Sequence, residues 1–171
     1  MSSSGEFMDR VNRLINDSRY QHYLHLNEEA EQGRIYCSHQ FEHLLATARL
    51  SWIFILESGV PYISREIAYA AALLHDIGRW QECAGKGDHA ILSSTLAEPL
   101  LRSAGFSRDE IGLITRAISR HRHDPAGQEV YTPLDQALYR ADKHSRICFT
   151  CEAHHSCHTL DRQPHRDRLE Y

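Results

Sequence analysis

The hydrophobic residues of this chain recur at helical spacing, and polar stretches separate them at intervals of about one helix. Glycine, proline and aspartate stand at these breaks, where they favour turns and helix ends. No stretch shows the strict alternation of apolar and polar residues that is typical of a half-buried strand. The pattern therefore predicts an all-α helical bundle. The expected helices cover residues 7–17, 20–32, 39–57, 64–78, a stretch starting near 88, 107–121 and 132–146.

Local signals predict the character and limits of several of these helices. The helix over 39–57 is apolar on both sides, which is typical of a central position. Pro99 removes a backbone donor, so we expect it to kink or divide its helix. Ser107 and Glu110 have the spacing of a capping box. Thr132 followed by a proline is a typical helix start.

Composition and charge narrow the class of protein. The chain has 171 residues, of which 42% are hydrophobic and 25% charged, so we expect one folded, soluble domain. The formal net charge of −4 offers no general attraction for nucleic acid, and no basic stripe is interleaved with aromatic residues. No apolar run reaches membrane-spanning length. The first ten residues contain no secretory signal, which predicts a cytoplasmic protein.

The thirteen histidines are unusual for this length, and several lie at the ends of core-facing stripes. A buried histidine or carboxylate without a partner costs several kcal/mol. For a single histidine the usual explanation is a hydrogen bond to a backbone carbonyl. Repetition along the chain favours a shared metal site instead, because imidazole and carboxylate together suit Fe, Mn, Zn, Co or Ni. The residues concerned are His75, Asp76, His89, His121 and Asp142, with His39 and His43 one turn apart at the start of another helix.

His75 and Asp76 are adjacent and end the most apolar of the expected helices. Neighbouring residues on a helix diverge by about 100°, so the two side chains cannot easily chelate one ion. An aspartate that bridges two ions, with the histidine on one of them, removes this difficulty. Two ions placed in this way hold a hydroxide as nucleophile and clamp a phosphoryl group.

These residues match a known pattern, and the chain resembles the HD-domain superfamily of metal-dependent phosphohydrolases. The resemblance runs from about residue 37 to 147 and implies an all-helical fold. We therefore expect N-terminal helices at 1–34, an HD domain at 35–147 and a Cys/His-rich segment with a frayed tail at 148–171. The matching stretches are "HLLATARL" with His43, "ALLHDIGRW" with His75 and Asp76, "LYRADKHSR" with Asp142, and, for the dinuclear subgroup, "GDHAILSSTLAE" with His89 and "AISRHRHD" with His121.

The resemblance implies a hydrolase that cleaves a phosphate ester or anhydride through a metal-bound hydroxide. Asp76 would bridge the ions, and Arg79 and Lys143 would contact the substrate phosphate during catalysis. Many members of the family have Lys at the position of Arg79. The arginine keeps the positive charge, but its guanidinium is not equivalent to an ammonium group. Lys86 and His144 are weaker phosphate contacts. The implied ligands of the two ions are His43, His75, Asp76, His89, His121 and Asp142.

Two histidines compete with the implied ligands. His39 competes with His43 for the first position, and we prefer His43 because the residues that follow it match the first helix of the family. His39 would then support the ligands or face the substrate. His123 competes with His121 but falls off the apolar stripe.

The metal and the substrate follow from the resemblance only in outline. Fe or Mn is expected first, and Zn, Co, Ni or Mg are alternatives. The pattern is similar to that of bacterial symmetrical diadenosine tetraphosphate hydrolases and of cyclic dinucleotide phosphodiesterases, although the Gly-Tyr-Pro segment of the latter is absent. A nucleotide or dinucleotide is therefore the expected substrate. The alternatives are a one-metal nucleotide monophosphatase, using only His43, His75, Asp76 and Asp142, and a non-catalytic metal- or nucleotide-binding module.

A second cluster of metal-ligating residues lies near the C-terminus, where three cysteines form a C-x2-C-x5-C pattern. Four thiolates would suit Zn or an iron–sulfur cluster, and Cys37 is the expected fourth ligand. His154, His155 or His158 are alternatives to Cys37, and buried or adventitious thiols are the simpler explanation of the pattern. Cys83 is expected to be an ordinary free thiol. The cysteines of the pattern are Cys148, Cys151 and Cys157.

Overall fold

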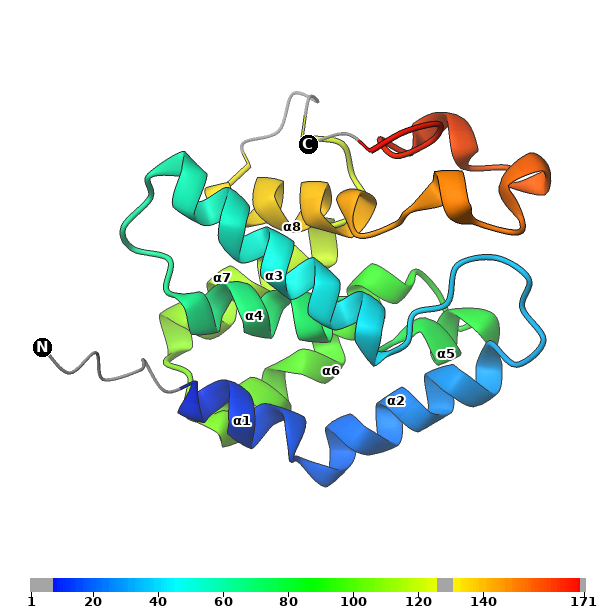
Figure 1. Cartoon of the computed structure of the whole chain (residues 1–171). Helices are drawn as coiled ribbons and strands as arrows, with labels where there is room; N and C mark the ends of the chain where they lie inside the picture. The colour runs from blue at the N-terminus through cyan, green and yellow to red at the C-terminus, as the bar shows by residue number, and fades with distance from the viewer. Residues whose placement is uncertain (1–7, 126–130, 170–171) are drawn as a thin grey trace, which may run out of the picture.

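The computed structural model describes residues 8–125 and 131–169, and within these ranges the chain is helical and contains no strand (Figure 1). The prediction of an all-α fold is confirmed. The helices are α1 (Asp9–Ile15), α2 (Ser18–Ala30), α3 (Phe41–Ser58), α4 (Arg65–Leu74), α5 (Arg79–Cys83), α6 (His89–Ala104), α7 (Arg108–Arg120) and α8 (Pro133–His144), followed by the short 3₁₀ helices η1 (Cys148–Thr150), η2 (His154–Ser156) and η3 (Leu160–Arg162).

Helix α4 occupies the centre of the bundle. It packs against α1, α3, α6, α7 and α8 (Figure 1). Its small alanine side chains allow these neighbours to approach closely, and Ser64 caps its first turn by accepting a hydrogen bond from the N–H of Ile67. The buried residues of α4 are Ile67, Ala68, Ala70, Ala71, Ala72, Leu73 and Leu74.

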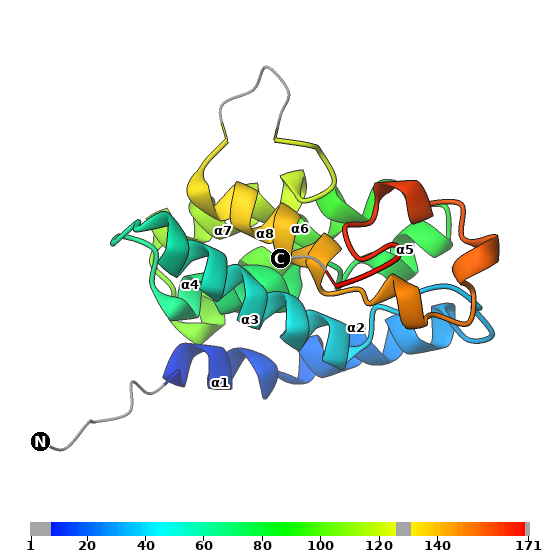
Figure 2. The same ribbon diagram turned by 45° about the horizontal axis from the view of Figure 1, so that its top comes forward.

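The N-terminal helices run along one edge of the bundle (Figures 1 and 2). Helix α1 packs on α4 and α6, and α2 packs on α5. The hydroxyl of Tyr20 in α2 donates a hydrogen bond to the carbonyl of Leu73 at 3.1 Å. Arg10 in α1 pairs with Glu66 at the start of α4 and with Glu110 in α7. These contacts fix the edge helices on the core.

Two expectations about single helices are wrong. Helix α3 is not surrounded by protein, because it packs mainly on α4 and α8 and leaves Ile53 and Leu56 exposed on its outer face. The expectation that Pro99 divides its helix is wrong, because α6 continues from His89 to Ala104, whereas the alternative of a kink at Pro99 stays a prediction. Packing of α6 against α1, α5 and α7 holds the helix together on both sides of the proline.

The predicted capping signals are confirmed. Ser107 accepts a hydrogen bond from the N–H of Glu110, whose carboxylate accepts one from the N–H of Ser107. Thr132 and Asp135 form the same reciprocal pair at the start of α8, where Pro133 is the first helical residue. These caps satisfy backbone donors that have no partner within the helix.

The charged tail is more ordered than its composition suggests. His165 is buried, and its ring lies 3.0 Å from the carbonyl oxygen of His144 at the end of α8. The N–H of Phe149 donates to the carbonyl of His165 at 3.1 Å. The expectation of a frayed tail is therefore wrong at His165, and residues 170–171 lie outside the described part of the chain.

None of the helices in the described ranges has the length and apolar character needed to cross a lipid bilayer.

Candidate metal centre

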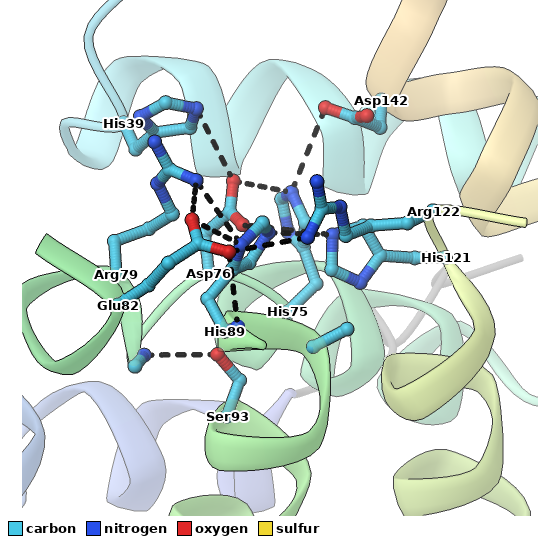
Figure 3. A network of polar contacts seen from close by, with 12 residues as sticks. His39, His75, Asp76, Arg79, Glu82, His89, Ser93, His121, Arg122 and Asp142 are labelled. Atoms are coloured by element: carbon cyan, nitrogen blue, oxygen red, sulfur yellow. Dashed lines mark hydrogen bonds and ion pairs between the residues drawn. The ribbon is translucent and has the colours of Figure 1, made fainter. Parts of the chain in front are cut away.

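Helix ends from five parts of the chain converge on one buried cluster of imidazoles and carboxylates (Figure 3). Helices α4 and α7 supply residues at their C-terminal ends, α8 supplies one in its last turn, and α3 and α6 supply residues in their first turns. Rigid helices packed on a common core thus set the positions of these side chains. The structure brings together all six predicted ligands: His43, His75, Asp76, His89, His121 and Asp142.

The cluster divides into two groups that share one residue. In each group the candidate ligand atoms lie within 4.8 Å of one another. Asp76 belongs to both groups, with His89 and His121 completing the smaller one. The larger group consists of His43, His75, Asp76 and Asp142.

The two carboxylate oxygens of Asp76 face different groups. Its Oδ2 lies 3.0 Å from Nε2 of His75 and 3.8 Å from Nε2 of His43. Its Oδ1 lies 3.0 Å from Nε2 of His89 and 3.6 Å from Nε2 of His121. On the other side of the larger group, Oδ1 of Asp142 lies 3.3 Å from Nε2 of His43. A carboxylate with one oxygen in each group is suited to bridge two ions.

Two of the histidines are oriented by backbone carbonyls. Nδ1 of His75 lies 2.6 Å from the carbonyl oxygen of Ala72, and Nδ1 of His121 lies 2.7 Å from that of Ile118. A carbonyl can only accept, so each Nδ1 carries the proton and the Nε2 lone pair points into the cluster.

Side chains orient two further histidines. The hydroxyl of Ser145 donates to the carbonyl of Asp142 and lies 3.1 Å from Nδ1 of His43, from which it can accept a hydrogen bond. Nδ1 of His89 lies 2.9 Å from a carboxylate oxygen of Glu82. This carboxylate–histidine arrangement is typical of metal ligands and fixes both the tautomer and the ring position.

Buried polar atoms at the centre of the cluster test whether the site fits a cation. Nε2 of His75 and Oδ1 of Asp76 are inaccessible to solvent, and although each faces a neighbouring ligand atom at 3.0 Å, neither makes a well-aligned hydrogen bond within the described chain. Buried polar groups without a hydrogen-bond partner are rare in native structures, because they are costly. The donor set of imidazoles and carboxylates, with buried and poorly satisfied atoms facing inward, fits divalent metal ions.

The pKa values reflect the same concentration of negative charge. Burial opposes ionisation of Asp76 and Asp142, but the neighbouring histidines hold the pKa of each carboxyl well below its ordinary value. Burial also opposes protonation of His75, but the two carboxylates outweigh it and raise the pKa of its imidazole to about 10. The pKa of His121 is lowered, chiefly by burial. The carboxylates therefore stay ionised and attract a cation, which is a proton when no metal is bound.

The turn that carries His75 and Asp76 is held from two sides. The side-chain amide of Asn27 donates to the carbonyl of Asp76 at 2.9 Å and accepts from the N–H of Trp80 at 2.8 Å. From the opposite side, Ser93 Oγ accepts from the N–H of Gly78 at 2.8 Å (Figure 3). A Cβ at Gly78 would lie 2.7 Å from the backbone nitrogen of Ser93, so only glycine allows this approach of α6.

A cavity of about 300 Å³ opens above the cluster, and basic side chains line it. Arg79 contacts the Glu82 carboxylate at 2.5 Å and His89 Nδ1 at 3.0 Å. Lys143 contacts Asp142 at 2.5 Å, so both predicted phosphate contacts lie in the cavity wall and are paired with carboxylates. The basic residues of the cavity are Arg34, Arg79, Arg122, Lys143 and Arg146.

Arg146 is a site residue that the sequence analysis missed. Its guanidinium lies 3.3 Å from Asp142 Oδ1 and 3.3 Å from Nε2 of His43. Burial disfavours the charge of Arg146, but the Asp142 carboxylate raises its pKa. Arg146 could have been predicted from the sequence, because it lies one helical turn after Asp142, just beyond the end of α8. Glu31 and Arg122 were missed because only the fold brings their segments beside Arg79 and Glu82, whereas Glu82 could have been found from its position three residues after Arg79.

The other predicted residues occupy different positions. His39 lines the cavity, with Nδ1 on Glu31 and Nε2 3.7 Å from Asp76, but it belongs to neither ligand group. Lys86 stacks over the ring of Trp80 and does not line the cavity. His123 is exposed, and His144 packs against Phe54.

The four predicted thiols gather beside the cavity. Cys37, Cys148 and Cys157 contribute to its wall, and Cys151 shares a neighbouring hollow with Cys37 and Cys148. All five cysteines are free, and Cys83 is exposed on α5. Among the described residues, the groups of three or more ligand atoms within 4.8 Å of one another consist of histidines and carboxylates, and the four thiols do not form such a group. The proposed thiolate site stays a prediction.

Comparisons with known proteins agree with this architecture. The family model of the HD domain matches residues 40–147. An uncharacterized protein of Clostridium beijerinckii is 33% identical over 154 residues, which cover 90% of this chain and 94% of that protein. The crystal structure of a predicted HD superfamily hydrolase from an uncultured Thermotogales bacterium is similar with a TM-score of 0.55 and 25% identity, over 74% of this chain and 68% of the other.

One further similarity is short. A bifunctional uridylyltransferase/uridylyl-removing enzyme of Erythrobacter litoralis is 40% identical over 58 residues, which are 34% of this chain and 6% of that enzyme.

Proposed function

The chain belongs to the HD-domain superfamily, and on this premise we propose that its histidine–aspartate cluster binds two divalent ions and hydrolyses a phosphate ester or anhydride of a nucleotide. The family match and the solved HD hydrolase support a metal-dependent phosphohydrolase in general. The observation that carries the two-ion proposal is Asp76, which directs one oxygen into each ligand group.

The ligands follow from the two groups. One ion would take His43, His75, Asp76 and Asp142, and the other would take Asp76, His89 and His121. When bound, such ions supply a nucleophile at neutral pH by lowering the pKa of a water, and they offset the charge of the phosphoryl oxygens. Histidine and carboxylate ligands suit Fe or Mn, with Zn, Co, Ni or Mg as alternatives.

The side chains of the cavity wall supply substrate binding. Lys143 and Arg146 both contact Asp142 and lie at one side of the cluster, where two cations would be available to the phosphoryl group of a bound substrate. Arg79 contributes a third cation, held in place by Glu82. A guanidinium can bind a phosphate through two parallel hydrogen bonds, so Arg79 and Arg146 would orient the group as well as attract it.

The volume of the cavity limits the size of the substrate that it can hold. About 300 Å³ is at the lower end of the volumes of small-molecule sites. A mononucleotide or a similar small phosphorylated compound suits this volume better than a dinucleotide. Tyr36 and His158 also line the cavity and offer aromatic faces on which a base can stack.

The test is phosphate release from a panel of nucleotides, dinucleotides and simple phosphate esters. The protein is loaded with Fe or Mn without air, beside Asp76→Asn and, as a matched control, Asp109→Asn on the exposed first turn of α7. We expect turnover of a mononucleotide by the native protein and by Asp109→Asn, and loss of at least about 10²-fold in Asp76→Asn. No turnover of any substrate by protein with bound metal would contradict the proposal and favour a non-catalytic binding module.

A further inference from the structure

The C-terminal segment that follows α8 contains successive tight turns, each of which begins or ends at a cysteine. The N–H of Cys151 donates to the carbonyl of Cys148 at 3.0 Å, and that of His154 donates to the carbonyl of Cys151 at 3.0 Å. The N–H of Cys157 in turn donates to the carbonyl of His154 at 3.3 Å. Three cysteines are thus presented by successive tight turns of one short segment.

The loop before α3 brings a fourth cysteine to this segment. The hydroxyl of Tyr36 donates to the carbonyl of Ser156 at 3.3 Å, and its ring packs edge-on against His158 with centroids 5.4 Å apart. Both views show this loop beside the C-terminal segment (Figures 1 and 2). Cys37, the next residue, lines a hollow of about 330 Å³ together with Cys148 and Cys151.

The thiol of Cys148 is influenced electrostatically by the other three thiols. The pKa of the Cys148 thiol is raised first by burial, and then by the nearby thiols of Cys37, Cys157 and Cys151. Arg146 acts in the opposite direction on Cys148. The other three thiols and the guanidinium of Arg146 therefore lie near the thiol of Cys148, in agreement with the two hollows that these cysteines line.

Apolar burial does not explain the order of this segment. Among the described side chains of residues 148–169, the buried ones are Cys148 and His165, and none joins the hydrophobic core that ends with Ala141. Ordering a chain costs conformational entropy at every residue. Small units without a core commonly meet this cost with a disulfide or a metal ion, and the cysteines here are free thiols.

The neighbouring histidines are engaged elsewhere. Nδ1 of His154 lies 3.0 Å from the carbonyl oxygen of Cys148, and its Nε2 lies 3.8 Å from the carboxylate of Asp167. The ring of His158 packs on Tyr36. The pairing of His154 with Asp167 and the packing of His158 on Tyr36 favour Cys37 over these two histidines, and His155 is exposed.

We propose that Cys37, Cys148, Cys151 and Cys157 bind one Zn²⁺ in a structural site that is separate from the histidine–aspartate cluster. Four thiolates in tetrahedral arrangement form a closed site, and Cys148 and Cys151 have the spacing typical of such sites. Binding releases the protons of the thiols, and Arg146 offsets part of the remaining negative charge. The ion would fasten the C-terminal segment to the loop before α3, on the wall of the substrate cavity.

Cobalt substitution tests the site independently of catalysis. Co²⁺ is titrated into reduced, chelator-treated protein of full length, and absorption is followed in the near-ultraviolet, where thiolate-to-cobalt charge transfer is intense. Histidine and carboxylate ligands give no such band. We expect the band in the native protein and in Asp76→Asn, its loss in Cys151→Ser, and its retention in Cys83→Ser, the matched control on α5.

Two further measurements decide the outcome. Circular dichroism of Cys151→Ser shows whether the helices remain, and Cys157→Ser replaces it if they do not. Zinc analysis of the native protein should give one ion that resists substitution of Asp76. Absence of the charge-transfer band, or a band that persists in both cysteine variants, would overturn the proposal. Iron with acid-labile sulfide in protein purified without air would overturn the assignment to zinc.

Discussion

The side-chain amide of Asn27 donates a hydrogen bond to the main-chain carbonyl of Asp76 at 2.9 Å, and the same amide accepts from the N–H of Trp80. Asn27 is 2% exposed and lies in α2, far from Asp76 in the sequence. The second helix of the chain therefore fixes the turn that presents the shared carboxylate. The HD-domain match begins at residue 40, so this support comes from outside the matched region.

Removing the Asn27 amide is expected to destabilise the fold and disturb the cluster. Asn27→Ala leaves the carbonyl of Asp76 and the N–H of Trp80 without their partner, at a cost of about 1–3 kcal/mol. Urea unfolding measures this loss, and phosphate release should fall with it. Asn12→Ala, on the exposed side of α1, is the control and should change stability by less than about 0.5 kcal/mol. Equal stability of the two variants would contradict this role for Asn27.

Gly78→Ala is expected to separate the His75–Asp76 turn from α6. The added Cβ would lie 2.7 Å from the backbone nitrogen of Ser93, so one of the two segments must move. Overpacking of this kind costs about 1–3 kcal/mol, and a shift of the Asp76 carboxylate relative to His89 can lower the rate by about 10²-fold.

Gly112→Ala is the matched control for this substitution. Gly112 lies inside α7, and a Cβ there would meet no atom within 4 Å. Alanine should stabilise this helix by about 0.5–1 kcal/mol. Thermal unfolding of the two variants should therefore shift in opposite directions, and a shift in the same direction would show that the contact with Ser93 is not limiting.

The family and the fold class were predictable because the pattern is local. Apolar periodicity, the caps at Ser107 and Thr132, and the His-Asp pair each depend on residues within a few turns of one another, and the matched family confirms the interpretation. The roles of the individual ligands stay predictions, as does the division of the chain at residues 34 and 147.

The supporting contacts were not predictable, because they join segments that no local pattern connects. Asn27 on Asp76, Ser93 on Gly78 and Glu31 on His39 depend on how the helices pack. Pro99 illustrates the converse, because of the two local effects expected there, a kink or a division, the division does not occur in α6.

The two ligand groups predict unequal effects of histidine substitutions on metal content. His89→Ala removes a ligand from the smaller group only and should leave one ion bound per chain, with most activity lost. His75→Ala removes a ligand from the larger group and exposes its two carboxylates to repulsion, so it should also reduce stability. Metal analysis after gel filtration gives the ratio of ions to chains. Full activity and unchanged metal content in His89→Ala would support the one-metal nucleotide monophosphatase instead.

The raised pKa of His75 predicts how the stability of the metal-free protein depends on pH. Because the folded pKa of about 10 lies above the ordinary value of 6.5, this group stabilises the fold fully below pH 6.5. The contribution is lost as the pH rises toward 10, with a slope on the order of 1 kcal/mol per pH unit. Chelator-treated protein should therefore unfold at lower urea concentration at pH 9 than at pH 6.5.

Metal should reverse this dependence. Ions compete with the proton for Nε2 of His75, so metal binding is favoured as the pH rises and adds to the stability of the folded state. Urea unfolding with saturating Mn²⁺ should give a higher midpoint at pH 8 than at pH 6.5, whereas the chelated protein gives the opposite order. The same pair of measurements on Asp76→Asn should show a weaker dependence in both conditions, because the variant lacks the carboxylate that raises the pKa of His75. An unchanged order with and without metal would mean that His75 is not a ligand.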